Sequence, residues 1–88
     1  MSLMEDCFAW TDEGRRVAAA FEPLHRQWWQ VCEQACHAES ALAVAWAVHL
    51  HAGGPRPTQE QADEADRLRA VATSRFNAAM AYLRSNPI

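Results

Sequence analysis

Eight apolar residues follow one another in the middle of this 88-residue chain: Ala41-Leu42-Ala43-Val44-Ala45-Trp46-Ala47-Val48. A helix that is apolar on every side cannot lie exposed on a water-soluble monomer. A domain of this length buries only about 60% of the surface of its unfolded chain, so it has little other protein to cover such a helix. The stretch therefore predicts a helix whose burial is completed by a second chain.

The composition indicates an all-α protein with close contacts between helices. Alanine accounts for 18 of the 88 residues, and it combines the highest helix propensity with a side chain small enough for helices to approach. The net charge is −3 and all eight basic residues are arginine. The acidic balance argues against general nucleic-acid binding, which usually needs a basic face. The absence of lysine is typical of a GC-rich genome, so a bacterial origin is expected.

The first helix is predicted for residues 11–52. Pro23 is the complication, because a proline inside a helix removes one hydrogen bond and clashes with the preceding turn. Apolar residues nevertheless keep an uninterrupted four-three spacing on both sides of it. We therefore expect one long, kinked helix; the alternative is a short helix that ends near Glu22, with Pro23 opening the next. The stripe consists of Val17, Phe21, Leu24, Trp28, Val31, Ala35, Ala38, Leu42, Ala45 and His49.

A turn and a second helix follow. Residues 53–57, Gly-Gly-Pro-Arg-Pro, end the first helix, since glycine and proline favour turns and stop helices. Thr58 and Gln61 then match a capping box, which predicts a second helix over residues 58–85. Its core stripe is expected to consist of Ala65, Leu68, Ala72, Phe76, Ala79 and Leu83.

The two helices form an antiparallel hairpin that leaves one broad side of each helix uncovered. Pairing two hairpins in a symmetric homodimer gives a four-helix bundle, which closes the apolar surface. We treat residues 1–88 as one domain, in which the N-terminal segment 1–10 can add a short turn capped by Ser2 and Glu5.

The candidate partner-binding residues lie where charge is sparse on the first helix. Glu33 and Glu39 are the only formal charges between Gln27 and Ala52, so this segment presents more apolar surface than one helix can cover. Tryptophan is also enriched at the energetic centres of interfaces. The alternative is that the tryptophans complete a core within the chain, together with the N-terminal segment. We predict partner contacts by Trp28, Trp29, Cys32, Cys36, Trp46 and Leu50.

Cys32 and Cys36 support a different hypothesis, a metal- or thiol-dependent sensor. Two such pairs facing each other across a dimer axis could supply four thiolates to zinc. Buried cysteine more commonly behaves as a small hydrophobe, so no cofactor or metal is expected. An odd cysteine count, with Cys7 as the third, favours a reducing cytoplasm over a disulfide framework.

Sequence signatures of catalysis are absent, including a P-loop, a dinucleotide-binding fingerprint and a zinc-protease motif. No apolar run approaches the roughly 20 residues of a membrane span. The sequence therefore predicts a small cytoplasmic, non-enzymatic interaction protein. It would act as a regulator, inhibitor or adaptor by binding itself and another protein, without contacting nucleic acid or membrane.

Overall fold

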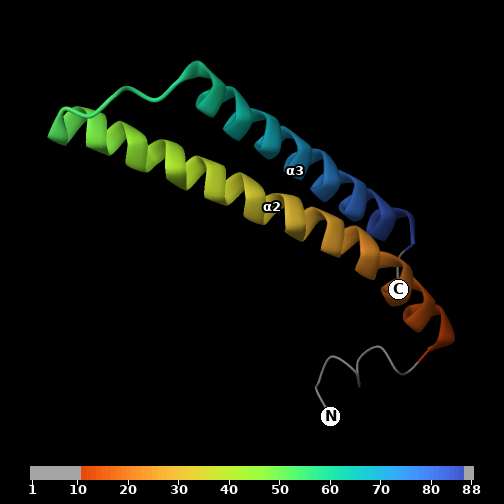
Figure 1. Cartoon of the computed structure of the whole chain (residues 1–88). Coiled ribbons are helices and arrows are strands. Elements are labelled where there is room, and N and C mark those ends of the chain that lie inside the picture. The colour runs from red at the N-terminus through yellow and green to blue at the C-terminus, as the bar shows by residue number, and fades with distance from the viewer. Residues whose placement is uncertain (1–10, 87–88) are drawn as a thin grey trace, which may run out of the picture.

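The structure, a computed structural model, describes residues 11–86. Two helices, α2 (Asp12–Ala52) and α3 (Gln59–Ser85), lie antiparallel along each other (Figure 1). The all-helical hairpin predicted from the sequence is confirmed. The short turn predicted within residues 1–10 lies outside the described residues.

Helix α2 continues through Pro23, so the single long helix is confirmed and the alternative of two helices is wrong. Pro23 is exposed, and a proline on the outer side of a helix costs one backbone hydrogen bond without disturbing the core. Thr11 is the N-cap, so the helix begins one residue later than the predicted range, and the Gly14 amide donates to Thr11 Oγ1 at 2.9 Å. This bond satisfies one of the amides that a helix N-terminus leaves free.

The turn is held by backbone and side-chain hydrogen bonds. Gly53 ends α2 with a φ of 71°, a left-handed conformation that glycine adopts without strain. The Gly54 amide donates to the Val48 carbonyl at 3.2 Å, and His49 Nδ1 donates to the Gly54 carbonyl at 2.8 Å. A Cβ atom at Gly54 would lie 2.6 Å from Val48 Cγ1. A side chain at this second position of the turn would therefore fit only if the Val48 side chain moved, which favours glycine there.

The predicted capping box starts α3. The Gln61 amide donates to Thr58 Oγ1 at 3.1 Å, and the Thr58 amide donates to Gln61 Oε1 at 2.8 Å. Thr58 itself is the N-cap, so the helix begins one residue later than the predicted range.

The contact between the helices follows the predicted stripes. All ten stripe residues of α2 are buried or half-buried. On α3 the buried residues are Ala65, Ala72 and Ala79, whose seven-residue spacing defines the line of contact. Phe76, predicted in the core, is instead 41% exposed, because it lies four residues after Ala72 and is rotated to one side of this line.

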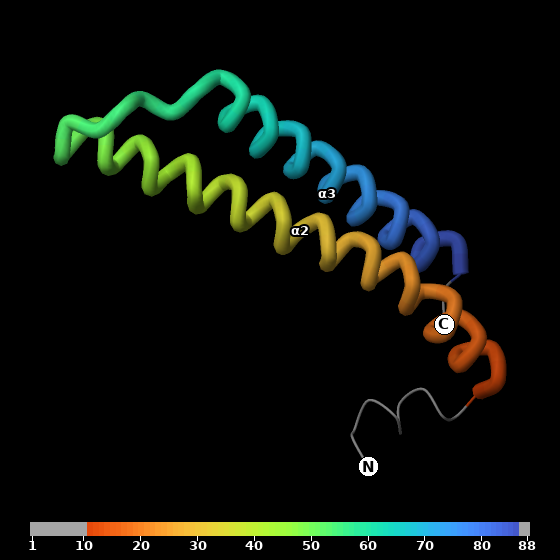
Figure 2. Tube along the Cα trace, viewed as in Figure 1, coloured from red at the N-terminus to blue at the C-terminus, as the bar shows by residue number. Residues whose placement is uncertain are grey.

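The core is thin, since no large side chain within residues 11–86 is fully buried. Apart from Val17, its buried apolar residues are alanines, which bring the helices close but remove little apolar area from water. The molecule measures 60 × 27 × 14 Å, and 14 Å is close to the diameter of one helix, about 10–12 Å. Figure 2 shows α2 running past α3 at the end nearer the N-terminus. No other helix of residues 11–86 therefore covers either broad face of the hairpin.

The capping box makes a measurable contribution to stability. We expect Thr58→Ala to lower the free energy of unfolding by about 1 kcal/mol, because it removes the acceptor for an amide of the first turn. Urea unfolding followed by circular dichroism at fixed protein concentration measures the change. Ser74→Ala, in the exposed interior of α3, is the control and should leave stability unchanged or slightly higher. Equal effects of the two substitutions would contradict a capping role for Thr58.

Candidate functional site

A second line of residues on α2 follows the core stripe one position later. Successive helix positions differ by about 100°, so this line points to one broad face of the hairpin, roughly at right angles to α3. The line consists of Trp29, Cys32, Cys36, Glu39, Ala43, Trp46 and Leu50.

Three residues of α3 share this face: Arg69, Thr73 and Phe76. The Arg69 guanidinium donates to both carboxylate oxygens of Glu39, with Nε–Oε2 at 3.0 Å and Nη2–Oε1 at 2.6 Å. Arg69 Nη2 also lies 3.7 Å from Cys36 Sγ. We call the second line of α2 together with these α3 residues the tryptophan face.

The tryptophan face exposes much of its apolar surface. Trp29 is 50% exposed and Leu50 is 69% exposed among the described residues. Cys36 is exposed and Cys32 is half-buried. Together with Trp46, five of the six residues predicted to bind a partner thus lie open or partly open on one face.

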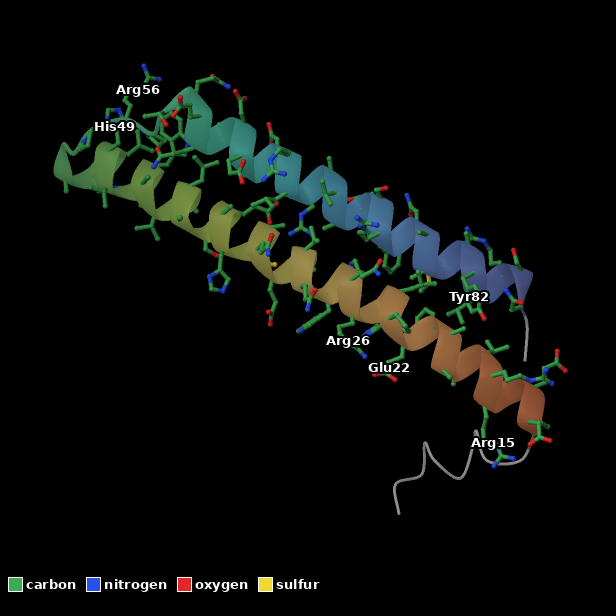
Figure 3. The ribbon with its side chains drawn as sticks, turned by 45° about the vertical axis from the view of Figure 1, so that its right-hand side comes forward. Arg15, Glu22, Arg26, His49, Arg56 and Tyr82 are labelled. Carbon is green, nitrogen blue, oxygen red and sulfur yellow. The ribbon has the colours of Figure 1, made fainter. Side chains whose placement is uncertain are left out.

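Trp46 is partly covered by the turn. The Arg56 guanidinium carbon lies 5.6 Å from the centre of the Trp46 ring system, a cation–π contact. The His49 ring packs edge-on at 6.0 Å from the same ring. Figure 3 shows His49 and Arg56 at the turn end of the hairpin. Trp46 nevertheless remains 38% exposed, so both residues hold its ring in place without hiding it.

Trp28 has a different position from the other predicted contact residues. It belongs to the core stripe, and its ring lies 5.5 Å from that of Phe76 in the contact between α2 and α3. Trp29 packs edge-on against Trp28 with ring centres 5.9 Å apart. Trp28 thus packs against Trp29 from within the core stripe, and of the two rings that of Trp29 is the exposed one.

Two open hollows indent the tryptophan face. The first, of about 230 Å³, is lined by Trp28, Cys32, Arg69, Ala72, Thr73 and Phe76. The second, of about 320 Å³, is lined by Leu42, Trp46, Arg56, Pro57, Thr58, Gln59 and Ala62. Each hollow combines apolar walls with an arginine, so each can accept an apolar side chain that carries one polar atom.

The opposite broad face is more polar. On α2 it is formed by residues one position before the core stripe, including Gln27 and Gln34, and only its last part is apolar. Val44, in this last part, is 63% exposed. Within the described chain, the apolar stretch 41–48 is therefore covered only in part, at Leu42 and Ala45.

Glu39 and Arg69 form the only ion pair between the helices among the described residues. The hydrogen bonds from Arg69 hold the pKa of Glu39 below its ordinary value of 4.5. The same bonds raise the pKa of Arg69 further above its usual range. Both side chains are more than one-third exposed, so water weakens the attraction and the pair orients the helices more than it stabilises them.

The contribution of α3 to this face is what sequence reasoning misses. Arg69 reads as one of several surface arginines, and Phe76 fits the core stripe equally well. The sequence does offer one signal, because Glu39 is one of only two formal charges on the predicted contact segment. A carboxylate in such a segment suggests a cationic partner on the second helix.

Comparisons with known proteins give no assignment, since the chain matches no family model, no curated protein and no solved structure. Within residues 11–86, no three His, Cys, Asp or Glu side chains are grouped to hold a metal ion. Neither described helix combines the length and hydropathy required to cross a bilayer.

Glu39 makes the stability depend on pH in a defined direction. Because folding lowers its pKa, its contribution is complete above the ordinary value and is lost as the pH falls through the folded-state pKa. We expect Glu39→Gln to lower the urea midpoint at neutral pH, and the difference from wild type to disappear in acid. Glu33→Gln, an exposed position on the same helix, is the control. A difference that persists unchanged in acid would contradict this role for the Glu39 carboxylate.

Proposed function

We propose that this protein is a small, non-enzymatic interaction module that binds helical partners through its tryptophan face. The observation that carries the proposal is the exposure of Trp29 and Leu50 on the part of α2 between Gln27 and Ala52, which holds only two formal charges, in a chain whose core buries no large side chain among the described residues. Exposed aromatic and aliphatic anchors on a rigid helix are typical of binding surfaces. A regulator, inhibitor or adaptor needs no more than this surface.

The proposed assembly is a homodimer in which two hairpins form a four-helix bundle. A stable interface removes about 800 Å² from each partner. The tryptophan face is the surface proposed for this interface, because it carries four of the six large apolar side chains that are exposed among residues 11–86: Trp29, Trp46, Leu50 and Phe76.

Location and chemistry complete the proposal. A reducing cytoplasm suits the free thiols of Cys32 and Cys36. These two residues act as small apolar contacts beside Arg69 in this proposal. The sensor hypothesis requires them to bind a metal instead, and elemental analysis of the purified protein distinguishes the two.

A charge at the centre of the exposed surface tests the proposal. We expect Trp29→Glu to raise the dissociation constant of the dimer by about thirtyfold or more, as loss of a central aromatic anchor does. Sedimentation velocity over a range of concentrations measures the change. Circular dichroism should show unaltered helix content, because Trp29 is half-exposed and outside the core stripe.

Gln30→Glu is the matched control for this experiment. It adds the same charge at the next position, which is exposed on the other side of α2, about 100° away. This variant should associate like wild type. A monomeric wild-type protein that binds no other chain, or equal association by wild type and Trp29→Glu, would refute the proposed function.

A further inference from the structure

The tryptophan face carries both projections and hollows, and their spacing makes it complementary to itself. Along α2, Trp29 is separated by 17 residues from Trp46, which lines the second hollow. Trp46 is separated by 14 residues from Cys32, which lines the first hollow. These two separations are similar, so one placement of a second copy brings both tryptophans to hollows. We infer that the partner of this face is a second copy of the chain, bound antiparallel with α2 lying on the partner's α2.

The choice of α2 against α2, and not against α3, follows from the distribution of apolar surface. Three of the four large apolar side chains that are exposed on the tryptophan face, Trp29, Trp46 and Leu50, lie on α2, and Phe76 alone lies on α3. Placing α2 on the partner's α3 would set Leu50 and Trp29 against a helix with many exposed polar residues. Contact between the two α2 helices instead buries apolar surface on apolar surface, which association requires.

The pairing of tryptophans with hollows locates the two-fold axis. In an antiparallel pair of identical helices, the two-fold axis lies midway between two positions that face each other. If Trp29 faces the partner's hollow beside Trp46, the axis lies between residues 37 and 38. If Trp46 faces the partner's hollow beside Cys32, the axis lies at residue 39. The axis therefore crosses α2 near residue 38. At 1.5 Å per residue, the Cys36 residues of the two copies are then offset by about 6 Å along the helix, and the Cys32 residues by about 18 Å.

The axis also passes beside the ion pair of Glu39 and Arg69. A two-fold axis at this point brings the two Glu39 carboxylates close together, which alone would be unfavourable. Arg69 bonds both oxygens of Glu39 within each chain. The two pairs can thus form a group of four alternating charges at the centre of the interface, and Arg69 acquires a role in association.

Thiol cross-linking tests this arrangement, which rests on the proposed function. Cys7→Ser/Cys32→Ser retains Cys36 as the one thiol, and Cys7→Ser/Cys36→Ser retains Cys32. The reagent is a bis-maleimide whose reach lies between the two expected separations. We expect the Cys36 variant to become a covalent dimer and the Cys32 variant to remain uncoupled, under conditions where sedimentation shows both to be dimers.

The outcomes separate this inference from the proposed function. A dimer in which Cys32 couples as well as Cys36, or in which Cys36 does not couple, overturns the antiparallel α2 arrangement and leaves the interaction module intact. A protein that remains monomeric and binds no other chain overturns both.

Charge substitutions provide a second test that needs no cysteine variant. We expect Arg69→Gln to raise the dissociation constant of the dimer by about tenfold, because it leaves two carboxylates facing each other. The double variant Glu39→Gln/Arg69→Gln should return to within a few-fold of wild type, since no carboxylate remains at the axis. Dimer weakening that the second substitution does not relieve would contradict an axis at this position.

Discussion

Burial of apolar surface is the constraint on which the rest of this structure depends. A hairpin of two helices is one helix thick and can cover each helix along one side only. Its contact line on α3 consists of alanines, which allow close approach but contribute little buried area each. Several aromatic side chains are therefore left at the edge of the contact or outside it. Trp29, Trp46 and Phe76 are the clearest examples.

The position of these aromatic residues relates the fold to the proposed function. A stripe that follows the core stripe by one residue must point to a broad face of the hairpin. On this face the helices provide a support for each exposed ring: Trp28 lies beneath Trp29, and the turn residues Arg56 and His49 flank Trp46. Rings held in this way lose little conformational freedom on binding, which favours association.

Much of the fold could be predicted because it depends on local chemistry. The caps at Thr11 and Thr58 and the glycines of the turn act on neighbouring backbone groups, so their residue types mark the helix ends. The four-three spacing identifies the contact stripe of α2 because a helix repeats its direction every seven residues. It also indicates correctly that Pro23 does not end the helix. On α3 the same reasoning places Phe76 too deeply, because two spacings of four residues in a row rotate the stripe.

By itself the sequence determined the two helices, their ends, the turn between them and the excess of apolar surface on the first, since each depends on residues near in the chain. The tertiary structure decided which residues of α3 join Trp29 and Cys36 on one face. This choice depends on how α3 is rotated and placed along α2. The alanine contact and the hydrogen bonds from Arg69 to Glu39 fix that placement, and these two residues are 30 positions apart in the sequence. Periodicity defines directions around one helix, but the relative placement of two helices results from packing between them.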